Sequence, residues 1–352
     1  MFRMLLKRVI GLQRPPTVFH AHISDGSILD RSMPNVNVTY QRVCSFHRSQ
    51  ARNMETKPRR AMLYVPGSDE RKLKKLTDLE VDCAVMDCED GVAVNKKVDA
   101  RNTIRSMLDR LSCPGVRDLA VRVNSVSSGL ADEDLMEIFK AERLPSTVML
   151  PKVESKAEVQ WFVKTVKSQL SKRSSQAPLR VVIFTETAIG LLRLPDILEE
   201  CQRASDATLV FEGVVFGSDD FCASIGATRT ADAHELLYAR QKVVATAKAF
   251  GMQAIDLVYI DFKDSVGLEE QSLQGARMGF TGKQVIHPNQ IPIVQTAFSP
   301  SEERIKWAQE LISAFEQHQA TGKGAFDFKG SMIDMPTVLQ ARNILKLAEV
   351  NS

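Results

Sequence analysis

The chain has 352 residues, of which 44% are hydrophobic and 25% are charged, as in a globular protein with one large core. No run of eighteen or more apolar residues occurs, so neither a membrane span nor a membrane partner is expected. The formal net charge is +3, but residues 1–60 hold eleven Lys and Arg against three acidic residues, which leaves 35 basic and 40 acidic residues for the rest. The positive charge therefore belongs to a leader, and no nucleic-acid partner is expected.

The leader opens with MFRMLLKRVIGL, in which Arg3, Lys7 and Arg8 lie opposite the apolar face of a short helix. An Arg-rich, acid-poor segment of this kind is typical of a mitochondrial transit peptide, whereas a secretory signal needs a longer apolar run. A basic tail without a targeting role is the alternative. Residues 1–57 are assigned to the leader, and the mature protein is expected in the mitochondrial matrix. The six cysteines form no CxxC pair, which fits reduced thiols in that compartment.

From Arg60 onward, short apolar runs alternate with segments of helical periodicity, the pattern of a parallel sheet with helical crossovers. Strands are expected at 61–65, 83–87, 119–123, 147–151, 180–185, 213–217, 254–259 and 283–287. Helices are expected at 69–79, 96–110, 131–140, 155–170, 190–204, 231–250 and 269–278. Eight units in about 230 residues predict an α/β fold, a (β/α)8 TIM barrel over residues 58–295. A doubly wound open sheet is the alternative.

The segment beyond Asn289 follows a different pattern. An amphipathic helix at 299–320 is followed by the Gly-rich stretch TGKGAFDFKGSMIDMP and a last helix at 336–348. A Gly-rich loop outside the eight barrel units indicates a mobile flap. Residues 296–352 are therefore assigned to a C-terminal helical extension that carries this flap.

Polar residues gather directly after the predicted strands. In chain order these segments read PGSD, CEDG, NS, KVES, ETA, SDD, IDF and HPNQ. In a barrel all of these strand ends meet at one rim, where catalytic residues of this architecture lie. Turns also favour Asp, Asn, Gly and Pro, but turn chemistry does not call for Arg122, Lys152 or Glu186, nor for the acidic pair Glu89 and Asp90. A catalytic rim is the favoured interpretation.

Two carboxylates suggest a metal site at this rim. Glu186 in FTETAIG and Asp220 in FGSDDF end the fifth and sixth predicted strands, which are neighbours in a barrel. Two carboxylates with room for water suit Mg²⁺, and the lack of clustered Cys or His makes zinc a poor fit. A helix N-cap and a metal-free acid/base pair are the alternatives. The adjacent Asp219 leaves open which of the two aspartates binds the metal.

Arg122 in VRVNS ends the third predicted strand and would point toward the same place. A guanidinium there can hold a substrate carboxylate and stabilise the charge of an enolate. Alternatively, Arg122 neutralises Glu89 or Asp90, and both roles can coexist. Glu89 and Asp90 are expected to orient Arg122 or a metal-bound water from behind the ligands.

The first loop, YVPGSDERKLKK, places Tyr64 at a strand end and basic residues on the next helix. An aromatic ring beside basic groups suits an adenine nucleotide with its phosphates, although a Lys-rich helix face is often only solvated. There is no GxGxxG and no GxxxxGK[ST] motif, which excludes a Rossmann dinucleotide site and a P-loop.

Taken together, the ordered motifs resemble the citrate lyase beta-like group of the HpcH/HpaI aldolase family, from about Arg59 to the last helix. The motifs are LYVPGSDERKLKK, DCEDGVAVNKKVDAR, VRVNSVSSGL, MLPKVES, ETAIGLL, VFGSDDFCASIGAT, IDLVYIDF, GFTGKQVIHPNQ and GSMIDMP. The resemblance implies a magnesium-dependent carbon–carbon lyase that cleaves citramalyl-CoA into acetyl-CoA and pyruvate. Malate synthase, methylmalate synthase or malyl-CoA thioesterase activity would be variants in the same site. A CoA-independent hydroxy-acid aldolase and a non-catalytic barrel module are the rival hypotheses.

The resemblance also implies roles for individual residues. Mg²⁺ would be held by Glu186 and Asp220, and Arg122 would contact the acid part of a CoA thioester substrate. The CoA moiety would contact Tyr64, Lys75 and Arg71, the last being basic where Lys is expected, and Ile286 and His287 would lie near the thioester. Asp334 in GSMIDMP would be the catalytic acid/base, delivered by the flap of a neighbouring subunit in a homotrimer. Without the resemblance, Asp334 reads as a turn or helix N-cap residue before Pro336.

Overall fold

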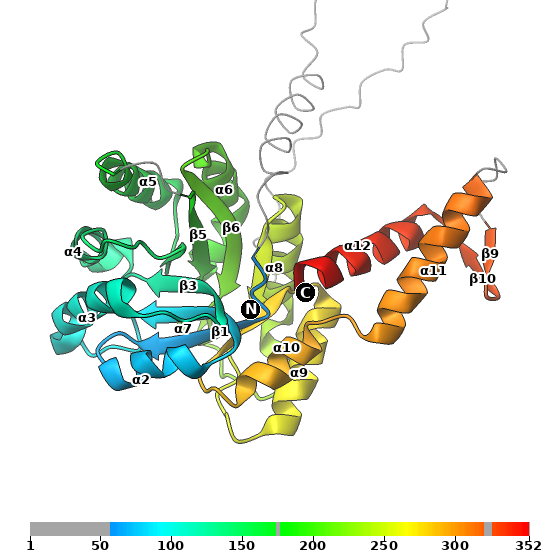
Figure 1. The fold of residues 1–352 in the computed structure, drawn as a ribbon, viewed down its shortest axis with the longest axis horizontal. Helices are drawn as coiled ribbons and strands as arrows, with labels where there is room; N and C mark the ends of the chain where they lie inside the picture. Colours follow the sequence, from blue (N-terminus) through cyan, green and yellow to red (C-terminus); the bar gives the residue numbers. More distant parts are fainter. Residues whose placement is uncertain (1–56, 174–176, 320–325, 352) are drawn as a thin grey trace, which may run out of the picture. The chain divides into compact units, whose positions relative to one another are not determined.

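The computed structural model describes residues 57–173, 177–319 and 326–351. The chain divides into two units, residues 1–55 and 56–352, and the predicted transit peptide lies outside the described residues apart from Lys57. The second unit contains a closed barrel of eight parallel strands in the order β1 to β8, with β8 paired to β1 (Figure 1). The predicted TIM barrel is thus confirmed, and the open sheet is wrong.

All eight predicted strands overlap observed strands. The strands are β1 Ala61–Pro66, β2 Val81–Asp87, β3 Val116–Arg122, β4 Thr147–Leu150, β5 Leu179–Thr185, β6 Leu209–Phe216, β7 Gln253–Asp256 and β8 Gly282–Val285. The predicted strand at 254–259 is too long at its end, because β7 stops at Asp256 and the apolar residues after it form a loop. Within the described residues, no helix is long and apolar enough to cross a membrane, and the five described cysteines are free thiols.

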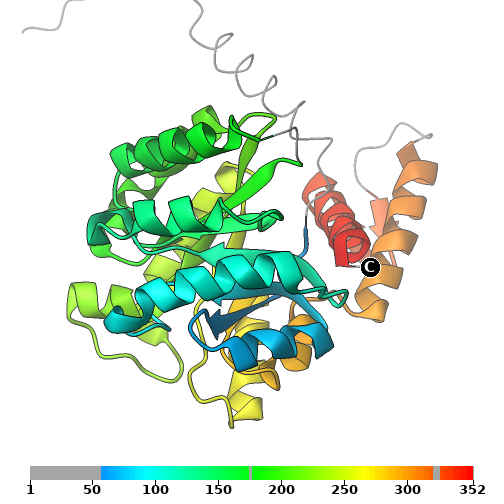
Figure 2. The same ribbon diagram turned by 60° about the vertical axis from the view of Figure 1, so that its left-hand side comes forward.

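Helices follow the strands and surround the barrel (Figures 1 and 2). They are α2 Glu70–Lys74, α3 Lys97–Arg110, α4 Ala131–Ile138, α5 Lys156–Leu170, α6 Ala188–Ala204, α7 Ser218–Ile225, α8 Leu237–Ala249, α9 Ser265–Met278 and α10 Gln290–Ala297. The expected helix at 69–79 is α2 followed by a 3-10 turn at Lys75–Asp78. Helices α7 and α10 were not expected. Ile291 and Val294 of α10 belong, with Phe298, to the large buried cluster between the strands and the surrounding helices.

The barrel interior follows the two-residue alternation of strands and thereby sets the direction of the site residues. Its core contains Met62, Cys83, Val85, Ala120, Met149, Val182, Phe184, Val215 and Ile255. Two residues beyond Val85 comes Asp87, two beyond Ala120 comes Arg122, and two beyond Phe184 comes Glu186. On β2, β3 and β5, the series of residues that point into the barrel therefore ends in a charged residue at the carboxyl end of the strand.

Arg59, just before β1, sits at the opposite end of the barrel with its side chain fully buried. Its guanidinium donates hydrogen bonds to Asp118 Oδ2 at 2.7 Å, to Glu212 Oε2 at 2.8 Å and to Thr147 Oγ1 at 3.0 Å. Burial alone would raise the pKa of Asp118, but Arg59 and its neighbours hold it at about 2. These contacts join Arg59 to the three strands β3, β4 and β6.

Replacing Arg59 by Met should destabilise the protein by about 3 kcal/mol, because the buried Asp118 carboxylate loses its closest cation and keeps only the longer contact with Lys57 at 3.5 Å. The measurement is urea unfolding followed by circular dichroism. Arg193→Met, on an exposed position of α6, is the matched control and should leave the urea midpoint unchanged. Equal midpoints for the two variants would show that Arg59 does not stabilise the barrel.

The C-terminal extension has a core of its own, separate from the barrel core. Helices α11 Glu302–Gln319 and α12 Met335–Asn351 pack side by side, with the hairpin β9 Phe326–Phe328 and β10 Ser331–Ile333 between them in sequence (Figure 2). Its buried residues are Ala308, Leu311, Phe315, Ile333, Val338 and Ala341. The predicted loop thus contains a hairpin that was missed, with positive φ at both turn residues, Lys329 at 53° and Gly330 at 81°.

Candidate active site

A cavity of about 670 Å³ opens at the carboxyl ends of the barrel strands. Nine of the residues named from the sequence line it, namely Tyr64, Lys75, Asp90, Arg122, Glu186, Asp219, Asp220, Ile286 and His287. Other lining residues include Lys72, Asp87, Gly91, Gly217 and Ser218. The structure therefore brings the predicted rim residues together around one space, as the barrel geometry requires.

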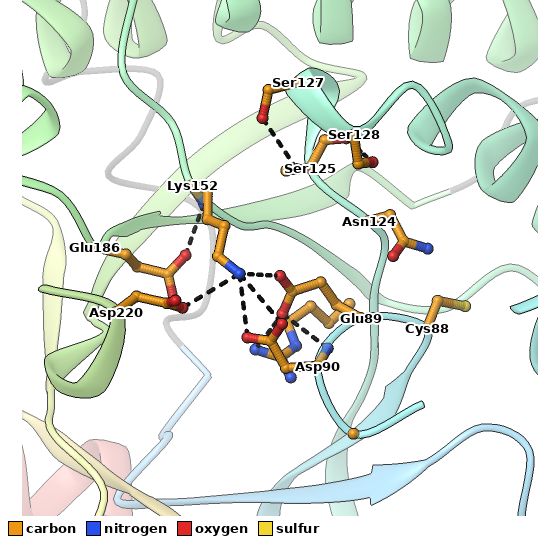
Figure 3. A network of polar contacts seen from close by, with 12 residues as sticks. Cys88, Glu89, Asp90, Asn124, Ser125, Ser127, Ser128, Lys152, Glu186 and Asp220 are labelled. Carbon is orange, nitrogen blue, oxygen red and sulfur yellow. Dashed lines mark hydrogen bonds and ion pairs between the residues drawn. The ribbon is translucent and has the colours of Figure 1, made fainter. Parts of the chain in front are cut away.

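Glu186 and Asp220 lie next to each other at this mouth (Figure 3). Glu186 is the last inward residue of the β5 row before Thr187 caps α6 by accepting a hydrogen bond from the Gly190 N–H. Asp220 lies in the first turn of α7. Its neighbour Asp219 instead pairs with Arg229 at 3.4 Å, so the geometry favours Asp220 over Asp219 as the partner of Glu186.

Burial raises the pKa of Glu186 to about 8, with the nearby Glu89 and Asp220 carboxylates adding to the effect. Glu186 Oε2 accepts a hydrogen bond of 2.7 Å from the Lys152 N–H, and the Lys152 ammonium is 3.2 Å from Asp220 Oδ2. A cationic group at this position shows that the local charge suits a cation. In the described part of the chain, no three His, Cys, Asp or Glu side chains form a metal cage. A pair of carboxylates with space for water fits Mg²⁺ and not zinc.

Gly217 makes room for the Glu186 side chain. A Cβ atom at residue 217 would lie 2.3 Å from Glu186 Oε1 and 2.4 Å from its Cγ. We therefore expect Gly217→Ala to displace Glu186 and to weaken Mg²⁺ binding about ten- to a hundredfold, measured by isothermal titration calorimetry. Gly213→Ala, on β6 as well, is the control, because its Cβ would meet only ordinary contacts at 3.5 Å. Equal affinities in both variants would contradict this role of Gly217.

Arg122 is held by the carboxylates of Asp87, which also lines the cavity, and Glu89. Its Nε and Nη2 donate to the two oxygens of Asp87, both at 2.7 Å, and its Nη1 is 2.9 Å from Glu89 Oε2. Burial would lower the pKa of Arg122, but Asp87 and Glu89 keep it well above its ordinary value. The guanidinium also lies 4.8 Å from the centre of the Tyr64 ring. Arg122 therefore neutralises Glu89, as the alternative interpretation held, while it still lines the cavity.

Asp87 was missed in the sequence, although its signal was present. It ends the buried strand VDCAVMD two residues beyond the inward Val85, so the alternation alone points it into the barrel. Besides holding Arg122, it accepts hydrogen bonds of 2.9 Å from the N–H groups of Glu89 and Gly91. Asp87 thus fixes the backbone of the CEDG loop and also the orientation of the Arg122 guanidinium.

Two lysines, for which no role was predicted from the sequence, hold the CEDG loop at residues 88–91 in place. Lys97 Nζ donates to the carbonyl oxygens of Cys88 and Glu89 and to Asn124 Oδ1, each at 2.8 Å. Lys152 Nζ donates to Glu89 Oε1 at 2.7 Å and to Asp90 Oδ1 at 3.2 Å. Only the position of Lys152 at a strand end distinguished it in the sequence.

Only some of the basic residues that follow β1 line the cavity. Lys72 and Lys75 line the cavity, whereas Arg71 is exposed on α2 and does not belong to the lining. After β8, which is the neighbour of β1, the His287 ring stacks on Phe262 at 4.8 Å between centroids, and Ile286 is exposed by 43%. These positions leave the predicted contacts with CoA untested.

Asp334 lies in the extension, where it begins α12. Its Oδ1 accepts hydrogen bonds from the Thr337 N–H at 3.1 Å and from Thr337 Oγ1 at 2.8 Å, which is an N-cap arrangement. These bonds, with the hydroxyl first, lower the pKa of the exposed Asp334 carboxyl. Among the described residues that line the cavity of the same chain, Asp334 is absent. Its expected catalytic role stays a prediction.

Comparisons with known proteins agree with this geometry. A family model described as HpcH/HpaI aldolase/citrate lyase matches residues 60–288. The mitochondrial citramalyl-CoA lyase of Homo sapiens is 57% identical over 292 residues, covering 83% of this chain and 86% of that protein. A (3S)-malyl-CoA thioesterase of Cereibacter sphaeroides is 32% identical over 292 residues, covering 83% of this chain and 95% of that protein.

A solved structure is also similar to this chain in fold and sequence. The structure of CitE from Mycobacterium tuberculosis in complex with magnesium, acetoacetate and coenzyme A superposes with a TM-score of 0.65 at 30% identity. It covers 83% of this chain and 98% of that chain. Since the family model spans most of the barrel and the human relative is similar over most of the sequence, the chain belongs to the HpcH/HpaI aldolase/citrate lyase family.

Proposed function

We propose that this chain is a magnesium-dependent carbon–carbon lyase that cleaves citramalyl-CoA into acetyl-CoA and pyruvate. The observation that carries the proposal is a single cavity that is lined by Glu186, Asp220 and Arg122 and also by Lys72 and Lys75. The human relative is named for this activity, and the CitE structure contains magnesium and coenzyme A. A carboxylate pair beside a guanidinium suits an acid substrate, and lysines suit the phosphates of CoA.

In the cleavage, the bond between the carbinol carbon and the thioester α-carbon breaks. The hydroxyl releases its proton to water in the cavity as it becomes the ketone of pyruvate, and the α-carbon gains a proton to become the methyl group of acetyl-CoA, so that the protons balance. Magnesium, held by Glu186 and Asp220, would supply Lewis-acid polarisation of the substrate oxygens. Arg122 binds the acid carboxylate and stabilises the negative charge that passes to the thioester. Asp334 delivers the proton to the α-carbon, or removes it in the synthetic direction.

The contacts with the rest of the substrate follow the same arrangement. Lys75 and Lys72 line the cavity and would bind phosphate groups of CoA, with Arg71 on the same helix contributing from its exposed position. Tyr64 lies under Arg122 and would pack against the substrate near the acid end. Ile286 and His287 would flank the thioester from the end of β8.

Asp334 is proposed to act on the barrel of a neighbouring subunit in a homotrimer. Support comes from its place on an extension with a separate core, and from its absence among the described lining residues of its own cavity. Since the human relative is named as mitochondrial, the protein is proposed to work in mitochondria, and specifically in the matrix.

The test is to incubate the purified protein with citramalyl-CoA and Mg²⁺ and to measure pyruvate with lactate dehydrogenase. We expect pyruvate and acetyl-CoA in equal amounts, and none in EDTA. Pyruvate from free citramalate but not from citramalyl-CoA would identify a CoA-independent aldolase. No product from either substrate would indicate a non-catalytic barrel.

Related activities in the same site are tested with other substrates. The malyl-CoA thioesterase relative motivates an assay of free CoA released from malyl-CoA. Condensation of acetyl-CoA with glyoxylate or pyruvate, followed by thioester hydrolysis, would give malate synthase or methylmalate synthase activity. These transferase reactions use the same enolate chemistry.

A further inference from the structure

Lys152, two residues after the end of β4, lies at the centre of the acidic residues at the barrel mouth (Figure 3). Its ammonium is 2.7 Å from Glu89 Oε1, 3.2 Å from Asp90 Oδ1 and 3.2 Å from Asp220 Oδ2. Its backbone N–H donates to Glu186 Oε2 at 2.7 Å. Both proposed metal ligands are therefore held by one residue, Glu186 through the backbone and Asp220 through the side chain.

The backbone of Lys152 adopts a left-handed conformation with φ of 53°. This region is unfavourable for residues with a Cβ atom, and Gly or Asn would occupy it at lower cost. Unfavourable conformations of this kind persist where the surrounding structure requires them, commonly at active sites. Because the next residue, Val153, donates to the Phe184 carbonyl, the turn at Lys152 is fixed against β5. A lysine at this position indicates that its ammonium is needed there.

The charges around Lys152 show what the ammonium does. The contact network within the described residues contains five carboxylates, of Asp87, Glu89, Asp90, Glu186 and Asp220, and two cations, Arg122 and Lys152. Arg122 is engaged by Asp87 and Glu89. Among the described residues, Lys152 is the ion-pair partner of Asp220, and the two side chains are 26% and 39% exposed, so solvent screens the pair in part.

We propose that Lys152 is a built-in counter-cation that competes with magnesium for Asp220 and thereby sets the metal affinity of the site. The Lys152 ammonium also forms ion pairs with Glu89 and Asp90, so it keeps two carboxylate partners when Asp220 binds the metal. When Asp220 binds the metal, the ammonium keeps these two carboxylates neutralised, so that they do not draw the metal away from Glu186 and Asp220. Lys152 is thus a positioning residue for the metal site. Because the metal site itself belongs to the proposed function, this role depends on that function.

The test measures Mg²⁺ affinity in the substrate-free protein by isothermal titration calorimetry, with Mn²⁺ binding followed by electron paramagnetic resonance as a second readout. Lys152→Met removes a positive charge beside the site and should lower the metal dissociation constant about tenfold, with a smaller effect at high ionic strength. Lys152→Arg keeps the charge and should bind the metal much as the wild type does. If Lys152→Met does not fold, Lys152→Gln serves the same purpose.

Lys156→Met is the matched control, since Lys156 is a nearby lysine that pairs with Asp196 and Glu199 on the helical exterior. It should leave the metal affinity unchanged. An unchanged or weaker affinity in Lys152→Met, while Glu186→Gln lowers the affinity about a hundredfold, would overturn the role of Lys152 and leave the proposed function intact. Wild-type protein that binds no Mg²⁺ at Glu186 would overturn both.

Discussion

Asp334→Asn should lower the turnover number for citramalyl-CoA cleavage about a thousandfold while the protein stays folded and binds Mg²⁺ normally. General acid–base catalysis contributes about a hundred- to ten-thousandfold, and an amide cannot carry the proton. Asn is as good an N-cap as Asp, so its oxygen can still accept the hydrogen bonds from Thr337 that begin α12. The substitution therefore separates catalysis from folding. Steady-state kinetics and calorimetry give the two readouts.

Mixing subunits tests where Asp334 acts. Asp334→Asn chains keep the metal ligands, and Glu186→Gln chains keep the flap carboxylate. If the flap serves a neighbouring barrel, co-expression of the two inactive variants should restore activity, because some mixed trimers contain one complete site. A mixture as inactive as its components would mean that each flap serves its own barrel, and unaltered turnover in Asp334→Asn alone would refute its catalytic role.

The sequence predicted the barrel and most of its mouth because both depend on strand alternation. Apolar runs placed the strands, and charged residues after them had to meet at one rim once the sheet closed. Glu186, Asp220 and Arg122 were found in this way, and the structure places all three on one cavity. Asp87 could have been found by the same alternation. It was missed because an acid at the end of a strand is also an ordinary turn residue.

Other features depend on contacts that sequence patterns do not carry. Lys152 matters through a left-handed turn and the direction of its side chain, which residue types alone do not specify. Arg71 and Lys72 are adjacent on the helix, and only the rotation of α2 decides that Lys72 and not Arg71 lines the cavity. Arg229, which is distant from the motif, pairs with Asp219, and this contact favours Asp220 as the metal ligand, which stays a prediction.

Mg²⁺ binding should depend steeply on pH below about 8, because Glu186 must lose its proton to become a ligand. Burial, followed by the charges of Glu89 and Asp220, raises the pKa of Glu186 from 4.5 to about 8, against the opposing effects of Arg122 and Lys152. Below that pH the apparent dissociation constant should rise about tenfold per pH unit. Calorimetry near neutral pH in buffers of different ionisation enthalpy should report the release of about one proton per Mg²⁺ bound.

The same pKa has a consequence for stability without the metal. Between pH 4.5 and about 8 the folded protein keeps a proton on Glu186 that the unfolded chain releases. Since stability falls with pH wherever the folded state binds more protons, the free energy of unfolding should decrease as pH rises through this range. Saturating Mg²⁺ should reverse the loss, because the metal binds the ionised carboxylate of the folded protein only.

Glu186→Gln isolates both effects. Gln is neutral at every pH and a weak magnesium ligand, so the affinity for Mg²⁺ should fall about a hundredfold and lose its pH dependence. Unfolding of the metal-free variant should be less sensitive to pH between 4.5 and 8 than that of the wild type. Lys283 acts in a different window, because burial lowers its pKa to about 7 and its contribution to stability therefore rises with pH above that value. A variant with wild-type affinity and an unchanged pH profile would show that Glu186 is not a metal ligand.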